Sequence, residues 1–335
     1  MKMHSSAKNK LRLIFGTVSG LTLAAVMPGA ADAADVQMPP PSTFSVSVEG
    51  GLSNWDPLNL WWATQDEAIA GVVCDPTVAD SCETQGKDPL YIKGWSGAAE
   101  FDWRPQGMGL DFLVRGRYDV SNTTHIAETW RNNGIYILPD GGTADYNENH
   151  VGLDFEVGHD LGLGSMNARV FGGVRFARFK GNSSFATYQY ESDWSGDGGE
   201  KAGQNAVGNI DRTFTGIGPR IGLNATLPFG DGGFGIDFAG SGALLLGDRV
   251  TTVSYSTYEL QGVKPEGSTQ FVVVPNLEAS AALFFKPTSN SKFSVGYRYD
   301  RYFGVMDTGL PGVEDGPNKQ DRTIQGPFAK IMFDF

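Results

Sequence analysis

The sequence predicts an all-β protein, a transmembrane antiparallel up-and-down β-barrel of about ten strands. Three observations carry this prediction: an alternating final segment that ends on Phe335, an export signal at the N-terminus, and a regular succession of short turns and long loops. Successive side chains of a strand point to opposite faces, so a membrane barrel shows one apolar and one polar face along each strand.

The C-terminal segment keeps this alternation up to its last residue. Ile331, Phe333 and Phe335 fall on one face, whereas Lys330 and Asp334 fall on the other. In an outer-membrane barrel the apolar face meets lipid and the polar face meets the lumen. We therefore interpret this segment as the closing strand of a barrel, and Phe335 as its assembly signal.

The N-terminal segment, residues 1–33, has the pattern of a secretory signal peptide. A basic stretch precedes a mostly apolar run over 11–26, and an A-x-A sequence ends at Ala33. This order is typical of a signal that is removed after export, so we expect cleavage between Ala33 and Ala34. Removal takes away four basic residues and one acidic residue and moves the net charge from −12 to −15.

The remaining chain divides into a Pro-containing lead-in over 34–43, which we expect in the periplasm, and a barrel over 44–335. It holds no run of 18 apolar residues, so the length criterion excludes a membrane-spanning helix. Its acidity argues against a nucleic-acid partner, because phosphate contacts need clustered Lys and Arg. The 45 glycines and 12% aromatic residues of the full sequence suit the wall of a barrel.

Connections along the chain alternate strictly between four short turns and five long loops, which implies ten strands and leaves eight or twelve as alternatives. The even count places both termini on the side of the short turns, which is the periplasmic side of outer-membrane barrels. The long loops are expected outside the cell, at residues 55–90, 121–145, 183–210, 248–268 and 306–321.

Charged residues gather on the face opposite the apolar one, where ten acidic and eight basic side chains nearly balance. A soluble sandwich would expose this face instead, but the charges recur on nearly every strand, and Trp and Tyr lie near strand ends, as in barrel girdles. The arginines can neutralise buried carboxylates or form a selectivity ring, and the near balance favours neutralisation. The candidate pore-lining residues are Glu100, Asp102, Arg115, Arg117, Asp154, Glu156, Arg169, Arg175, Arg220, Asp237, Glu278, Arg298, Asp300 and Lys330.

Cys74 and Cys82 lie close together in a polar stretch, and in an oxidising compartment we expect them to form a disulfide. No metal or cofactor is expected, because no group of residues has the usual ligand spacing. Histidines are the natural centre of a hydrolytic site, but His150 is interpreted as a solvated residue at the barrel rim. We therefore expect no enzyme activity.

Several segments resemble the Legionella-type major outer membrane protein family. They are GHDL at 158–161, RVFGGVRFAR at 169–178, FTGIGPRIGL at 214–223, AGSGALLLG at 239–247, VPNLEA at 274–279 and VGYR at 295–298. The resemblance covers residues 150–335 and is weaker over 44–150. It implies an outer-membrane barrel that forms a pore, with no catalytic residues, and it does not carry over a solute selectivity.

These observations lead to one expected function and one alternative. We expect a porin in a Gram-negative outer membrane, which passes small hydrophilic solutes or ions by diffusion and depends on the barrel-assembly machinery and on membrane lipid. The alternative is a non-conducting structural or surface-interaction barrel whose long loops bind partners. The sequence leaves open whether the protein forms a homo-oligomer.

Overall fold

The computed structural model describes residues 43–56, 92–130, 140–163, 166–191, 201–230, 233–257, 264–307 and 319–335. All of them belong to one compact unit, Pro39–Phe335. In this described part of the chain, no helix is long and apolar enough to cross a membrane. The predicted cleavage site at Ala33 and Ala34 and the predicted disulfide between Cys74 and Cys82 lie outside the described residues.

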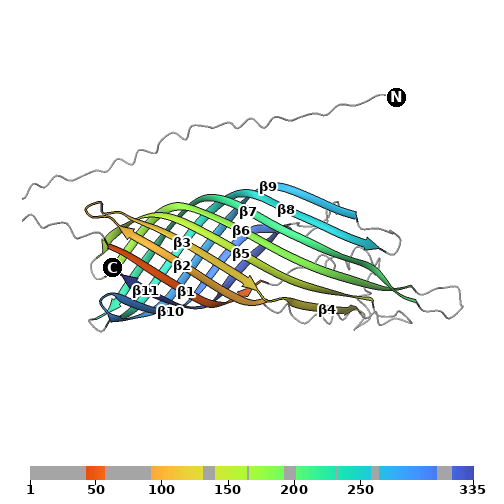
Figure 1. Cartoon of the computed structure of the whole chain (residues 1–335), viewed down its shortest axis with the longest axis horizontal. Helices are drawn as coiled ribbons and strands as arrows, with labels where there is room; N and C mark the ends of the chain where they lie inside the picture. Colours follow the sequence, from red (N-terminus) through yellow and green to blue (C-terminus); the bar gives the residue numbers. More distant parts are fainter. Residues whose placement is uncertain are drawn as a thin grey trace, which may run out of the picture. The chain divides into compact units, whose positions relative to one another are not determined.

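The described residues form eleven β-strands of one sheet, and Figure 1 shows that the strands are tilted in the same sense. Their bounds are β1 Thr43–Trp55, β2 Ile92–Arg104, β3 Asp111–Ser121, β4 Thr124–Trp130, β5 Asp140–Leu163, β6 Met166–Glu191, β7 Lys201–Phe229, β8 Phe234–Thr257, β9 Lys264–Thr288, β10 Ser291–Asp307 and β11 Lys319–Asp334.

Every strand pairs antiparallel with its neighbours, and the sheet closes on itself through β1 with β11 and through β3 with β5. β3 and β4 both pair with β5, at successive positions along it, and Asn122 and Thr123 separate them. They therefore occupy one strand position, and the barrel has ten. The predicted all-β, up-and-down barrel of ten strands is confirmed.

Short turns join the strands at one end of the barrel, as predicted: β2 to β3, β5 to β6, β7 to β8 and β9 to β10. Gly107 and Gly109, with φ of 77° and 63°, allow the first of these turns, since other residues rarely adopt this conformation. β1 begins and β11 ends at the same side, which is the periplasmic side in barrels of this kind.

The two faces of the wall are reversed relative to a soluble protein. On β1, Val46 and Val48 face outward and are 38% and 57% exposed, whereas Ser47 and Glu49 face the lumen and are 4% and 5% exposed. The same alternation continues around the barrel, with apolar side chains on the outside and charged ones inside. The apolar exterior suits lipid, and it argues against the soluble sandwich considered from the sequence.

Four predicted loops are shorter than expected, because strands run on into residues 121–145, 183–210, 248–268 and 306–321. β7, for example, has 29 residues, although crossing a membrane takes about 9–11. Beyond the lipid the outward face no longer needs apolar side chains, so the alternation that marks a strand in the sequence disappears.

The extra length forms a wall that rises on one side of the barrel, where Figure 1 shows β4 to β9 reaching farthest from the C-terminus. β9 pairs with β10 only up to Asn276 and Tyr302, whereas it pairs with β8 as far as Lys264. The outer parts of β4 to β9 are therefore an open sheet and not a closed barrel, within the described residues.

Candidate functional site in the barrel lumen

All fourteen residues predicted to line a pore project into the lumen. Successive side chains of a strand point to opposite faces, and each of these residues is adjacent in sequence to an outward-facing residue of the wall. Ten of them line a cavity at the periplasmic end, and the other four, Arg117, Asp154, Arg175 and Asp300, are buried deeper in the same network. Whether they line a conducting pore stays a prediction.

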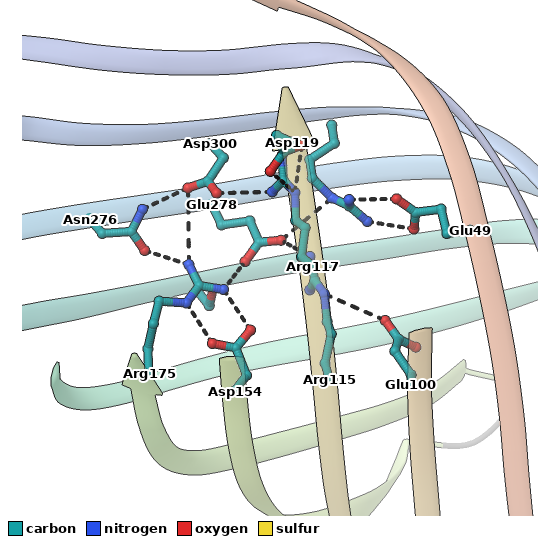
Figure 2. Close-up of polar contacts among 12 residues, drawn as sticks. Glu49, Glu100, Arg115, Arg117, Asp119, Asp154, Arg175, Asn276, Glu278 and Asp300 are labelled. Carbon is teal, nitrogen blue, oxygen red and sulfur yellow. Dashed lines mark hydrogen bonds and ion pairs between the residues drawn. The ribbon is translucent and has the colours of Figure 1, made fainter. Parts of the chain in front are cut away.

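Glu278 on β9 is the centre of this network, and Figure 2 shows the side chains that converge on it. Its Oε1 accepts a hydrogen bond from Arg115 Nη2 at 2.6 Å, and its Oε2 accepts from Arg175 Nη2 at 2.6 Å and from Arg220 Nη2 at 2.8 Å. Arg298 Nε lies 3.5 Å from Oε1. One carboxylate thus meets arginines from β3, β6, β7 and β10.

Asp154 and Glu156, two residues apart on β5, share these arginines. Asp154 accepts two hydrogen bonds from Arg175, at 2.6 and 2.8 Å, and lies 2.8 Å from Arg220. Glu156 accepts from Arg169 Nη1 at 2.9 Å and also pairs with Arg220. Bidentate and shared contacts of this kind hold each arginine in one orientation and also neutralise its charge.

Two further pairs attach the network to the strands that close the barrel. Arg298 on β10 forms a bidentate pair with Glu49 on β1, at 2.5 and 2.6 Å. Lys330 on β11 pairs with Glu100 on β2, across β1. Charges near the start and the end of the chain are therefore tied to the same network as those in its middle.

His150 lies inside the barrel and not at a solvated rim, so the interpretation from the sequence is wrong. It is 1% exposed, its Nδ1 lies 2.8 Å from Asp119 Oδ2, and its Nε2 lies 3.2 Å from the Tyr302 hydroxyl. Phe179 packs against its ring, with centroids 4.5 Å apart. Although Asp, His and Tyr form a chain of contacts here, all three are at most 1% exposed, so a substrate could not reach them.

Arg117 joins this histidine cluster to the central network. It pairs with Asp119 at 2.9 Å and with Asp300 at 2.9 Å. Asn276 then donates to Asp300 at 2.6 Å and accepts from Arg175 at 2.6 Å, as the dashed lines in Figure 2 show. The central network and the histidine cluster thus form one continuous polar layer across the lumen.

The periplasmic half of the lumen holds a cavity of about 880 Å³. Arg220, Glu278 and Arg298 belong to the network at its inner end, while Thr43 and Asp334 line it where β1 begins and β11 ends. We call this cavity the vestibule. Its lining contains equal numbers of acidic and basic side chains, eight of each, so it carries no strong preference for one sign of charge.

An apolar layer closes the lumen on the outer side of the charged network. Its members are Trp55, Ile92, Tyr146, Ala177, Phe179, Ile210, Phe214, Ala243, Leu245, Val253, Val274, Tyr302, Val305, Met306 and Ile324. Each is 6% exposed or less, although the lumen of a membrane barrel is ordinarily polar. We call this layer the plug.

The outer end of β10 supplies part of the plug by separating from β9. After Tyr302 it no longer pairs with β9, and its register with β11 shifts between Tyr302 and Met306. Gly304, with φ of 63°, allows the kink. Val305 and Met306 are then fully buried among the other residues of the plug.

Two buried arginines from β7 and β8 hold this segment in place. Arg249 on β8 donates to the carbonyl oxygens of Gly304 and Met306 at 3.1 and 3.2 Å, and Arg212 on β7 donates to that of Asp307 at 2.7 Å. On the other side, Asp321 accepts a hydrogen bond from the Gly304 amide at 2.8 Å. Asp321 also accepts from Arg301, which raises the pKa of that guanidinium.

The sequence reasoning missed Arg212, Arg249 and Arg322 because all three fall within or beside predicted loops. Arg322 is fully buried and pairs with Glu148 at 2.8 Å. The available signal was local: Arg212 lies between Ile210 and Phe214 at a spacing of two, which places all three on one face of a strand.

The described residues hold no group of three or more His, Cys, Asp or Glu that could bind a metal ion.

Comparison with known proteins places this barrel in a family. Residues 105–335 match the family of the Legionella pneumophila major outer membrane protein precursor. The chain belongs to this family. The match begins before residue 150, so it includes β3 to β5 as well as the segments from which the resemblance was noted. No curated protein sequence matches the chain.

Solved structures of outer-membrane proteins resemble this chain only distantly. The outer membrane protease OmpT from Escherichia coli is 12% identical, with a TM-score of 0.46, over 89% of this chain and 97% of that one. A major outer membrane protein from Thermus thermophilus is also 12% identical, with a TM-score of 0.34, over 88% of this chain and 99% of that one. Family membership and the apolar exterior of the barrel together locate the protein in the outer membrane.

Proposed function

We propose that the protein is a pore-forming barrel of the outer membrane for ions and small hydrophilic solutes, closed by its own side chains in the conformation described above. The observation that carries the proposal is the polar vestibule of about 880 Å³, which leads from the periplasmic end to the centre of the lumen. The pore-forming character implied by the family resemblance supports it.

The plug is the part of the lumen that we expect to move first when solutes pass. The charged network ties together strands around the whole wall, so opening it would separate many buried ion pairs at once. The inturned end of β10 is held instead by three hydrogen bonds from two arginines, by the hydrogen bond from the Gly304 amide to Asp321, by its remaining pairing with β11 and by apolar contacts. We infer that opening begins with this segment, and that the lumen arginines and carboxylates then decide which ions and small solutes pass.

Export and assembly complete the proposal. Residues 1–33 act as the signal peptide, with cleavage between Ala33 and Ala34, and Cys74 and Cys82 form a disulfide in the oxidising space outside the inner membrane. The mature chain is then inserted by the barrel-assembly machinery, with Phe335 as its signal.

The test is the conductance of the refolded mature protein in planar bilayers, after heat-modifiable gel mobility has shown a folded barrel. Arg212→Gln with Arg249→Gln removes the guanidinium groups that hold the inturned segment, and Val305→Ser with Met306→Ser weakens its apolar contacts. We expect rare, small openings for the wild type and more frequent openings for either double variant. Folded barrels that stay silent in all three proteins would contradict the proposal.

A surface-interaction barrel is the second candidate, and the outer sheet of β4 to β9 favours it. The outer part of β9 has no described partner strand on its β10 side, and such an edge can accept an extended peptide. A barrel of this kind would be silent in bilayers, and removal of its outer sheet would abolish partner binding without changing conductance.

A further inference from the structure

Two cations stand on the outward face of β6, immediately beyond the apolar belt. Val174 and Phe176 are the apolar residues on this face that come directly before Arg178 and Lys180, which follow at the same spacing of two. Both cations are exposed, whereas Phe179 between them points into the plug and is fully buried. Their position on the side of the long connections puts them at the level of the outer leaflet's head groups.

The neighbouring strands offer neutral, hydrogen-bonding or amphipathic side chains around this pair. Arg178 lies opposite Val151 and Thr215, and Lys180 lies opposite Asn149 and Thr213. Tyr118 on β3 faces outward beside Val151 and is 51% exposed, as expected of an aromatic residue at a membrane interface.

Neither cation forms an ion pair within the part of the chain that the structure describes. Two acidic residues lie near them on the outward face. Asp211 is one position farther out on β7, where Asn182 donates a hydrogen bond to it at 2.8 Å, and Asp248 on β8 lies in the row of Arg178, beyond Thr215. The lumen arginines, in contrast, all meet carboxylates or carbonyl oxygens. The charge of Arg178 and Lys180 is therefore available to a ligand from outside.

We propose that Arg178 and Lys180 bind the phosphate of a lipid head group in the outer leaflet, with the lipid's acyl chains lying along Phe176 and Val174. Basic side chains at a membrane surface attract anionic lipids. A lipid fits better than a free phosphate ion, because two exposed cations in salt solution hold a small ion weakly, whereas a lipid adds apolar contact with the belt.

The experiment measures lipid retention by the folded barrel with native mass spectrometry. The probes are a diphosphorylated lipid A-type glycolipid and the same glycolipid without phosphate, each titrated into delipidated protein. Arg178→Gln with Lys180→Gln removes both charges. Lys286→Gln is the matched control, because Lys286 is an exposed cation at the periplasmic end.

We expect the double variant to bind the phosphorylated glycolipid roughly 30-fold more weakly, since each surface cation contributes about fivefold. The control should bind like the wild type, and Arg178→Lys, which keeps the charge, should retain most of the affinity. Equal binding by the wild type and the double variant would overturn the proposal. So would equal binding of the phosphate-free glycolipid, which would assign retention to the apolar belt, or full competition by inorganic phosphate, which would assign a free-ion site.

Discussion

Glu278 shows how strongly a single residue depends on its surroundings in this lumen. It receives hydrogen bonds from three arginines, and a fourth lies 3.5 Å away. In an interior shielded from water, the desolvation cost of these ions is offset only while each has its partners. The carboxylate therefore stabilises the barrel chiefly by preventing four cations from facing one another.

We predict that Glu278→Gln lowers the free energy of unfolding by about 3–5 kcal/mol, the cost of removing one partner from buried ion pairs. The measurement is denaturant unfolding of the refolded barrel in lipid. Asp248→Asn is the control, because Asp248 is exposed on the outer face, and its change should stay within about 0.5 kcal/mol. Equal, small effects of the two substitutions would show that the network is solvated.

The direction in which residues point could be predicted from the sequence, but their partners could not. Alternation alone places Arg115 and Glu278 in the lumen, yet 163 residues separate them, and only closure of the barrel brings them together. His150 was misplaced for a related reason. The local sequence marks it as near a strand end, whereas the outer extension of β5 continues past it and encloses it.

Strand length is the element-scale property that the sequence conceals. Hydrophobic alternation detects a strand only where one face meets lipid or a core, so residues 183–210 were predicted as a loop although β6 and β7 occupy most of them. The inturned end of β10 was likewise unpredictable, because it depends on contacts with Arg212 and Arg249 from strands far along the chain.

Gly218 on β7 allows a close approach to β8, and a substitution there tests how much stability depends on it. A Cβ atom there would lie 1.8 Å from the carbonyl oxygen of Leu244 on β8, so the two strands would have to separate. We predict that Gly218→Ala destabilises the barrel by roughly 1–3 kcal/mol, as overpacking does in protein interiors. Denaturant unfolding followed by tryptophan fluorescence measures this change.

Gly172→Ala on β6 is the matched control for this prediction. A Cβ atom at Gly172 has no neighbour within 4 Å, and its φ is not in the left-handed region. The substitution should leave stability unchanged or raise it slightly, since glycine inside a strand costs about 0.5–1 kcal/mol. Loss of stability in both variants to the same degree would mean that strand separation is not the cause.

Closure of the whole molecule brings its first and last strands together. Phe44 and Phe335 exchange backbone hydrogen bonds at 3.2 and 2.8 Å, and their rings stack with centroids 4.8 Å apart. Phe335 is nevertheless 63% exposed, so its side chain adds little buried area to the closed barrel. A residue that contributes little to the folded state but ends the closing strand is well placed to be recognised before the barrel forms.

We predict that Phe335→Ala separates assembly from stability. Its accumulation in the outer membrane of cells should fall strongly, whereas the purified variant should refold in lipid with a loss of about 1 kcal/mol or less, the value of one aromatic pair. Phe333→Ala is the control, because Phe333 lies on the same strand and the same lipid face and is 44% exposed. If Phe335 acted only through packing, both variants would lose accumulation and stability in parallel; unchanged accumulation of Phe335→Ala would reject its role as the assembly signal.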